Sequence, residues 1–329
     1  MKSFLHLGRS AFLSAFLLAG MAVSALPAHA EPGYPNKPVK IIVAFAPGGG
    51  SDFIARLVGQ KLGEKLGQPV VIENRPGAGG NLGASLALRA PADGYTLLLA
   101  AASYTVNPAL YKLSFDPLKD ITPIAQLARG PFLIAVNPKL PVNNLKELVD
   151  LAKKEPGKLN YGSAGTGSIV QLATEYFLDM SGADILHIPY KGTSPALTDT
   201  VAGQVQLVFG TVASTLPFAK SGQLKALAVT TPDRLAALPN VPTAVESGFP
   251  AYEVTNWHGI IGPKGIPQDV VATLNKAINE ALLAPGMNAQ MASDGLTVAG
   301  GTAEAFGELL ATETARWGAL AKKRGIKVE

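Results

Sequence analysis

The chain has 329 residues, no cysteine, and a formal net charge of +4 from 28 basic and 24 acidic residues. The absence of cysteine excludes disulfides, thiolate metal sites and thiol catalysis. The near-neutral charge, with no basic run longer than the three residues 322–324, argues against a nucleic-acid-binding protein. Any selectivity for anions must therefore be local, built from backbone amides and hydroxyl groups.

The first thirty residues have the pattern of a secretory signal peptide. Two basic residues flank the start of an apolar stretch over 11–26, and the Ala-His-Ala sequence at 28–30 fits the small-x-small rule for cleavage. We expect residues 1–30 to be removed, so that the mature chain begins near Glu31. The apolar stretch is shorter than the ~20 residues of a membrane-spanning helix, so a membrane anchor is the weaker interpretation.

The chain after residue 38 predicts alternating strands and helices. Residues 39–45 form a continuous run rich in Ile and Val, which is typical of a strand buried on both faces of a parallel sheet. A helix over 51–66 follows, with apolar residues on one stripe. A strand at 69–73, a helix at 81–90 and a strand at 95–100 complete a β-α-β-α-β unit. This order implies a doubly wound α/β sheet with right-handed crossovers.

A second series of elements begins after 132–137. It predicts helices and strands in alternation at 144–154, 158–162, 168–180, 185–189, 195–202 and 205–209, and a further strand at 224–230. A proline-rich connection then leads to a strand at 257–262 and helices at 267–283 and 302–324.

Because the first unit has only three strands, we expect the C-terminal tail to return to it. Domain 1 would then comprise 31–130 and 256–329, and domain 2 would comprise 131–255. The chain would cross between the domains twice, near 129–136 and 254–259, and two crossings make a hinge.

Two glycine-rich turns, at 46–52 and 161–168, each follow a predicted strand and open a predicted helix. A helix start leaves amide N–H groups unpaired and carries partial positive charge, and glycine lets a ligand approach the backbone closely. Ligands of open α/β sheets bind beyond the carboxyl ends of the strands. The two turns therefore predict capture of one carboxylate, although ordinary strand-to-helix connections would also explain them.

Other chemistries fit these turns less well. Residues 162–167 have the spacing of a phosphate loop without its lysine, and 77–83 misses the dinucleotide fingerprint. Ser163 resembles a hydrolase nucleophile, yet Tyr161 breaks the G-x-S-x-G frame. Its base would have to be His187 or His258, and His187, in the apolar run 186–189, also fits an ordinary packed histidine. Hydrolysis is the main enzymatic alternative; we expect no catalytic residue, cofactor or metal.

Aromatic residues mark the predicted strand ends and crossings: Phe45, Tyr104, Tyr190, Phe209 and Trp257. Core packing would explain each of them. If several face a cleft instead, they would suit an organic acid with an apolar or aromatic body.

Six motifs follow one another along the chain: Ala46-Pro47-Gly48-Gly49 with Asp52, Glu73-Asn74-Arg75-Pro76-Gly77-Ala78-Gly79-Gly80, Asp93-Gly94-Tyr95-Thr96, Tyr161-Gly162-Ser163 with Gly165 and Gly167-Ser168, Pro189-Tyr190-Lys191-Gly192, and Val241-Pro242-Thr243 with Glu246 and Gly248. Together they closely resemble the Bug family, the extracytoplasmic solute receptors of tripartite tricarboxylate transporters. The resemblance covers essentially the whole mature chain.

The resemblance implies a type II periplasmic-binding-protein fold, with two doubly wound α/β domains, a two-crossing hinge and a ligand cleft between the domains. It also implies a periplasmic protein, expected to be a monomer, that captures a small organic carboxylate without chemistry. The ligand would be a di- or tricarboxylate or an aromatic acid, delivered to transporter subunits in the cytoplasmic membrane. A ligand-presenting sensor component is an alternative, and a periplasmic hydrolase is a weaker one.

By the same resemblance, the two turns would hold a carboxylate of the ligand, partly through ordered water. The residues expected there are Phe45, Ala46, Gly48, Gly49, Ser51, Asp52, Ser163, Gly165, Thr166, Gly167 and Ser168. The rest of the ligand is expected to contact Ser103, Tyr104, Asn107, Tyr190, Phe209, Asn256 and His258. Asp52 would cap its helix rather than touch an anion. The family often has histidine where this chain has Gln171, a departure that bears on local hydrogen bonding and not on the fold.

Overall fold

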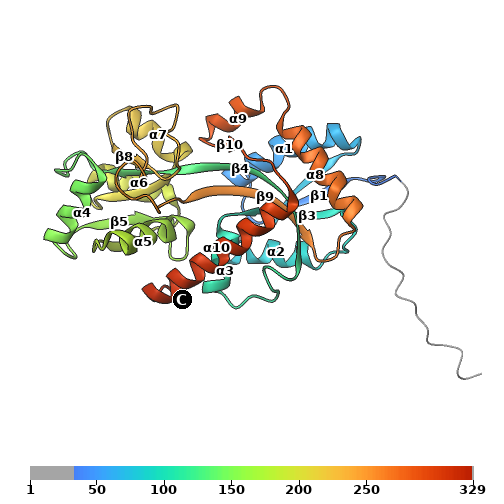
Figure 1. The fold of residues 1–329 in the computed structure, drawn as a ribbon, viewed down its shortest axis with the longest axis horizontal. Coiled ribbons are helices and arrows are strands. Elements are labelled where there is room, and N and C mark those ends of the chain that lie inside the picture. Colours follow the sequence, from blue (N-terminus) through green and yellow to red (C-terminus); the bar gives the residue numbers. More distant parts are fainter. Residues whose placement is uncertain (1–32, 328–329) are drawn as a thin grey trace, which may run out of the picture.

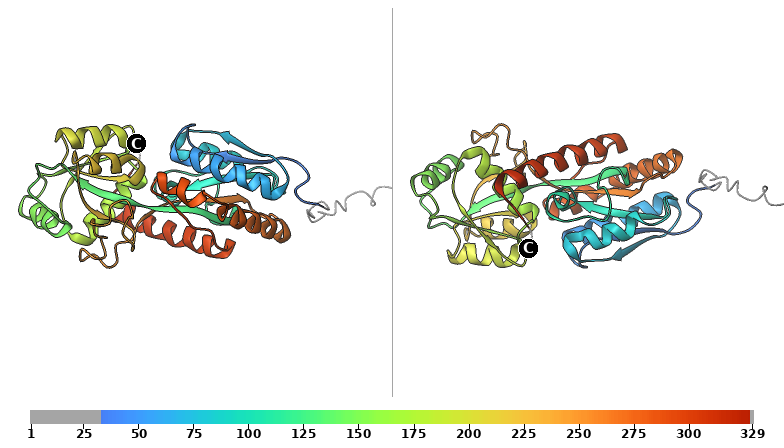
Figure 2. Two further views of the ribbon diagram at one scale, coloured as in Figure 1. Left: turned by 90° about the horizontal axis from the view of Figure 1, so that it is seen from above. Right: turned by 90° about the horizontal axis from the view of Figure 1, so that it is seen from below.

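The computed structural model describes residues 33–327, so the predicted signal peptide and its cleavage site lie outside the described residues. Two lobes lie side by side and are joined by long central strands (Figure 1). We call residues 33–131 and 255–302 the first lobe and residues 132–254 the second lobe. Views from above and below show helices on both faces of the central strands (Figure 2).

The first lobe begins with the predicted β-α-β-α-β unit. Its elements are β1 (Val39–Val43), α1 (Gly50–Leu66), β2 (Val70–Asn74), α2 (Asn81–Leu88) and β3 (Thr96–Ala101). Strand β1 pairs in parallel with both β2 and β3. Further elements complete the lobe: the short 3-10 turn η1 (Ala78–Gly80), α3 (Ser103–Leu110), α8 (Gln268–Leu282), α9 (Met287–Ser293) and β10 (Thr297–Val298).

The second lobe repeats the alternation of strands and helices. Its elements are α4 (Leu145–Lys154), β5 (Asn160–Ser163), α5 (Ile169–Ser181), β6 (Leu186–Pro189), α6 (Thr193–Ala202), β7 (Leu207–Thr211), α7 (Val212–Lys220) and β8 (Lys225–Val229). Strand β5 pairs in parallel with β6 and β7. The α/β class predicted from the alternation is confirmed.

Two long strands, β4 (Ile121–Val136) and β9 (Thr255–Pro263), join the lobes. Strand β4 pairs antiparallel with β9 as far as Pro131, opposite Thr255, and then with β7 and β8 from Phe132 and Leu133 onward. The sheet is therefore continuous, in the order β2-β1-β3-β9-β4-β7-β5-β6. Its centre is antiparallel, whereas the sequence predicts only the parallel part, because an apolar strand pattern carries no information about direction.

Helix α10 (Ala303–Arg324) packs against both lobes. Near its start, Phe306 and Leu310 belong to a first-lobe core cluster. Near its end, Trp317 belongs to the second-lobe core, and the Arg324 Nε atom lies 2.7 Å from the Glu175 Oε2 atom on α5. The helix thus forms a third connection beside β4 and β9 (Figure 1). The placement of 256–329 in one domain stays a prediction.

Three helices are absent from the sequence-based prediction: α3, α7 and α9. Helices α3 and α7 contain Pro108 and Pro217, which remove a backbone donor and signal a break. Burial outweighs this local preference, because Val106 in α3 and Val212 in α7 are buried.

No helix within residues 33–327 combines the length and apolar composition required to cross a membrane. The same residues include no group of three or more His, Cys, Asp or Glu side chains that could hold a metal ion.

We expect Leu310→Ala to lower the free energy of unfolding by about 2–5 kcal/mol, because it leaves a cavity in a fully buried position. Leu283→Ala is the matched control, since the Leu283 side chain is 82% exposed; its effect should stay within about 0.5 kcal/mol. Urea denaturation of both variants measures the difference. Equal losses would show that α10 is not held through this core contact.

Candidate ligand-binding site

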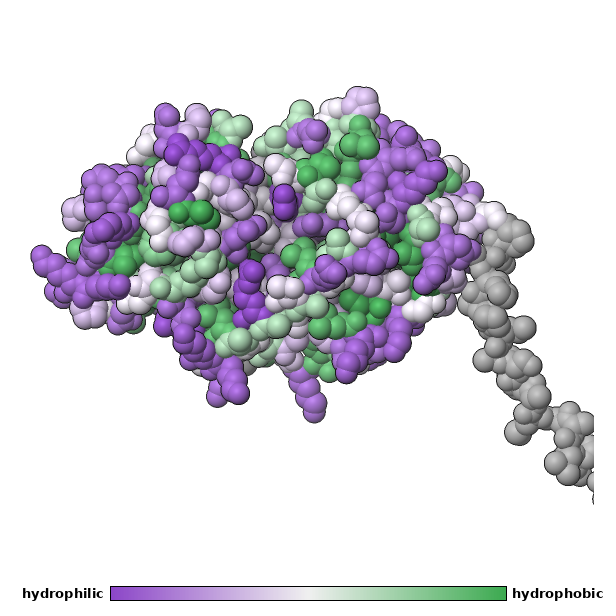
Figure 3. Space-filling view, in the orientation of Figure 1, coloured by the Kyte–Doolittle hydropathy of each residue, from purple (hydrophilic) through white to green (hydrophobic). Residues whose placement is uncertain are grey.

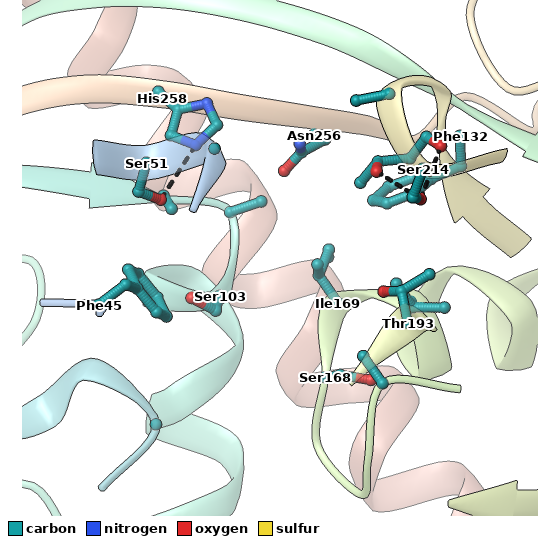
Figure 4. Close-up of a pocket in the computed structure, with 18 of the residues that line it drawn as sticks. Phe45, Ser51, Ser103, Phe132, Ser168, Ile169, Thr193, Ser214, Asn256 and His258 are labelled. Carbon is teal, nitrogen blue, oxygen red and sulfur yellow. Dashed lines mark hydrogen bonds between the residues drawn. The ribbon is translucent and has the colours of Figure 1, made fainter. Parts of the chain in front are cut away.

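A cavity of about 810 Å³ lies between the two lobes. The surface is visibly hollowed there in the space-filling view (Figure 3). In the close-up, Phe45, Ser51 and Ser103 of the first lobe face Ile169 and Thr193 of the second across open space (Figure 4). A ligand in this cavity would contact both lobes.

In the described part of the chain, five helices begin at the wall of this cavity: α1, α3, α5, α6 and α7. Each directly follows a strand of a parallel pair, namely β1, β3, β5, β6 and β7, so their starts gather beyond the carboxyl ends of the strands. A helix start presents unpaired N–H groups and partial positive charge. The arrangement is suited to an anion.

The first glycine-rich turn is held from behind by Asp52. The Gly48 N–H donates to the Asp52 Oδ2 atom at 2.9 Å, and Asn74 Nδ2 donates to its Oδ1 atom at 2.9 Å. Hydrogen bonding from Arg56 is the main cause that lowers the pKa of Asp52 to about 2. Gly48 itself has φ +80°, a conformation that favours glycine. Asp52 therefore organises the turn and does not line the cavity.

The second glycine-rich turn depends on Gln171. The Gly167 N–H donates to the Gln171 Oε1 atom at 2.7 Å. The Gln171 N–H in turn donates to the Ser168 Oγ atom at 3.2 Å, so that Ser168 caps α5. The glutamine amide thus ties the turn to its helix.

A chain of hydrogen bonds fixes the proton on His187. The oxygen of Gln171 is occupied by the Gly167 N–H, so its NH₂ group faces the His187 Nδ1 atom at 3.1 Å and must donate. Burial lowers the pKa of His187 and keeps the ring neutral. Its one proton is therefore on Nε2, which lies 2.6 Å from the Ser163 Oγ atom.

This tautomer argues against Ser163 as a nucleophile. A base must accept the hydroxyl proton, but here the ring donates to Ser163, and the Ser163 hydroxyl donates to the Gly165 carbonyl at 3.1 Å. Ser163 is also fully buried and does not line the cavity. The network supports the shape of the second turn.

His258 supports the first lobe's side of the cavity. Its Nε2 atom lies 3.2 Å from the Ser51 Oγ atom, and its Nδ1 atom is buried without a hydrogen-bond partner among the described residues. Burial lowers the pKa of His258 to about 4, so the ring is neutral. A buried N–H without an acceptor is rarer than a buried acceptor without a donor. The partnerless Nδ1 atom is therefore the unprotonated one, and the proton is on Nε2. The Ser51 hydroxyl is then free to donate to a ligand.

The cavity wall has little charge. None of its described residues is lysine or arginine, and its only acidic residue is Asp294. An anion there would be held by backbone N–H groups and by the hydroxyls of Ser51, Ser103 and Ser168 rather than by a cationic side chain.

The structure brings many of the predicted site residues to this wall: Phe45, Gly48, Ser51, Ser103, Asn107, Thr166, Gly167, Ser168, Asn256 and His258. The others lie outside it: Ala46, Gly49, Asp52, Tyr104, Ser163, Gly165, Tyr190 and Phe209.

Three aromatic residues lie outside the wall because each has a partner elsewhere. The Tyr104 hydroxyl donates to the Pro117 carbonyl at 2.9 Å, and the Tyr190 hydroxyl donates to the Asp199 Oδ2 atom at 2.7 Å. Phe209 is fully buried in the second-lobe core. The cavity takes its aromatic lining from Phe45 and from two residues that the sequence did not single out, which are Tyr111 and Phe132.

Other wall residues also escaped the sequence analysis: Thr193, Ser194, Thr211, Ala213, Ser214, Asp294 and Leu296. The hydroxyl residues at the starts of α6 and α7 follow predicted strands, and this position could have identified them as candidates for the site. Each is preceded by a single glycine, Gly192 or Gly210, and not by a glycine-rich turn, so they resemble ordinary caps.

Comparison with known proteins places these features in one family. Residues 54–326 match the model described as tripartite tricarboxylate transporter family receptor. The chain is 36% identical to Protein BugT of Bordetella pertussis over 90% of its length and 92% of that protein. The structure named periplasmic binding protein BugD is 37% identical, covering 90% of this chain and all of that one, with a TM-score of 0.74. R. palustris Rpa4515 with adipate is 34% identical, with the same coverage and a TM-score of 0.77.

We expect stability to fall between pH 6.5 and pH 4 through His258. Its pKa is lowered from 6.5 to about 4 by burial, so stabilisation from the neutral ring is fully present above pH 6.5 and lost as pH falls. The shift corresponds to about 3 kcal/mol. Urea denaturation should show that the free energy of unfolding falls by about 3 kcal/mol less between pH 6.5 and pH 4 in His258→Asn than in the unmodified protein. Parallel curves for both proteins would contradict the assignment.

Proposed function

The chain belongs to the tripartite tricarboxylate transporter receptors, the Bug family, and on that basis we propose that it is a periplasmic solute-binding protein. It captures a small organic carboxylate between its lobes and delivers it to the membrane subunits of a transporter. The observation that carries this proposal is the convergence of five helix starts on a cavity whose described wall has no lysine or arginine.

Backbone dipoles and hydroxyls can supply the required affinity. A helix start contributes ~0.3–1 kcal/mol toward an anion when exposed and up to ~2 kcal/mol when partly buried. Hydrogen bonds to a charged group add about 1.5–3 kcal/mol each. Two helix starts and two or three such bonds give a gross stabilisation of about 4–13 kcal/mol, against which the cost of association is set, whereas a micromolar complex needs a net ~8 kcal/mol. No buried cationic side chain is needed.

Binding is coupled to closure in this proposal. The turn at α1 belongs to the first lobe and the turn at α5 to the second, so one carboxylate that reaches both is held best when the lobes approach. A ligand shifts the equilibrium only through its preferential affinity for the closed form. We take the predicted domains, 31–130 with 256–329 and 131–255, as the moving units, and β4 and β9 as their hinge.

The wall also suits the body of an organic acid. The apolar residues Phe45, Phe132, Ile169 and Leu296 line the cavity beside the amides, and Phe132 among them is fully buried. Rpa4515 with adipate is a relative whose ligand has two carboxylates joined by a hydrocarbon chain. We propose a di- or tricarboxylate or an aromatic acid as the ligand class.

The predicted signal peptide and the likeness to a periplasmic binding protein, BugD, support export to the periplasm. A monomer is the proposed state. Capture of transporter subunits from solubilised membranes by the ligand-loaded protein would support delivery for uptake, whereas capture of a membrane kinase would favour the sensor alternative.

We expect Gly48→Ala to weaken binding of adipate, citrate and benzoate alike, by about tenfold or more for any that bind, because a side chain strains the first turn and shields its amides. Gly67→Ala is the matched control. Both glycines have positive φ, +80° and +66°, with nothing within 4 Å of an added Cβ, but Gly67 ends α1 away from the cavity.

Calorimetric titration of both variants tests this expectation. Equal affinities for the two variants would remove the first turn from the binding site. If the unmodified protein bound none of a panel of mono-, di- and tricarboxylates with and without aromatic rings, the proposed function itself would fail.

A further inference from the structure

We infer that the ligand carries a cationic or N–H-donating nitrogen group in addition to its carboxylate, and that Asp294 binds this group. The inference rests on the proposed capture of a carboxylate between the lobes, and it replaces the ligand class proposed above. The ligand class becomes amino-substituted carboxylic acids, such as amino acids, in preference to acids that bear only carboxylates.

The position of Asp294 makes it part of the same cavity. It follows the last residue of α9 and lines the wall, with its Oδ2 atom 3.7 Å from where a Cβ on Gly50 would lie. Gly50 is in the first turn of α1, whose amides are proposed to hold the carboxylate. The next residue, Gly295, packs closely against Val212 at the start of α7. Asp294 therefore lies where the two lobes meet.

The Asp294 carboxylate is unpaired, in contrast to Asp52 near the same turn. Asp52 accepts hydrogen bonds from Gly48, Arg56 and Asn74. Among residues 33–327, no side chain or backbone group donates to the Asp294 carboxylate or forms an ion pair with it. Its backbone N–H donates to the Met291 carbonyl at 3.0 Å, which fixes the chain at this point. Asp294 is thus held in place at its backbone, and its partly exposed carboxylate has no hydrogen-bond partner within residues 33–327.

This carboxylate also makes the cavity selective. It has only acceptor capacity when ionised, and the described wall offers no lysine or arginine to neutralise it. Partial burial weakens its hydration and raises its pKa. A second ligand carboxylate near it would be repelled, whereas an ammonium or amide N–H would form a charge-assisted hydrogen bond. The amides of α1 would bind the negatively charged end of a ligand, and the carboxylate of Asp294 would bind its positively charged end.

Matched ligand pairs test the inference, because each pair exchanges a terminal carboxylate for an ammonium. The pairs are succinate with β-alanine, glutarate with 4-aminobutyrate, adipate with 6-aminohexanoate, and terephthalate with 4-(aminomethyl)benzoate. We expect calorimetry on the unmodified protein to show at least tenfold tighter binding of the amino acid in at least one pair.

Asp294→Asn keeps the shape of the side chain and removes its charge. It should weaken the preferred amino acid at least tenfold and leave or improve the affinity for its diacid partner. Asp233→Asn is the charge-matched control, since Asp233 is exposed and does not line the cavity. It should leave both affinities unchanged.

Preference for the diacid in every pair, or an unchanged ratio in Asp294→Asn, would overturn the inference. In that case, weaker diacid binding by Gly48→Ala would still support carboxylate capture. The proposed function would then be supported without the proposed role of Asp294. If the unmodified protein bound no member of any pair and no acid of the wider panel, both would fall.

Discussion

The structure depends on one constraint: an anion can be held without a cationic side chain only where several backbone N–H groups point at the same place. Parallel strands satisfy this constraint, because their carboxyl ends all lie at the same edge of the sheet and each strand can lead directly into a helix. In this protein β1 and β3 do so in the first lobe, and β5, β6 and β7 do so in the second. The antiparallel pair β4 and β9 then brings the two edges together around the cavity.

The parts of the site that could be predicted are those whose backbone conformation is set by the local sequence. Gly48 and Gly167 line the cavity with positive φ, and glycine-rich turns between a strand and a helix signal such backbones. Alternation of apolar runs with amphipathic segments likewise predicted most helices and strands. These features depend on neighbours in the sequence, so they can be identified without knowledge of the fold.

The remainder of the site depends on contacts between distant segments. Tyr190 directly follows β6 as predicted, whereas Phe209 is in the middle of β7 and not at its end. The partners that draw their side chains away, Asp199 and the second-lobe core, are set by packing. Asp294 reaches the wall only because the tail folds back onto the first lobe. No period or motif around Asp294 marks it, and an unpaired carboxylate is recognisable only when its surroundings are known.

Helix α10 has a mechanical consequence for the receptor. It packs on α3 and on α5, and both of those helices begin at the cavity, one in each lobe. A rotation of one lobe relative to the other must therefore tilt or slide α10, whose anchors Phe306 and Trp317 are buried in different cores. Because much of α10 is exposed to solvent, such a tilt or slide would change the exterior of the protein along this helix.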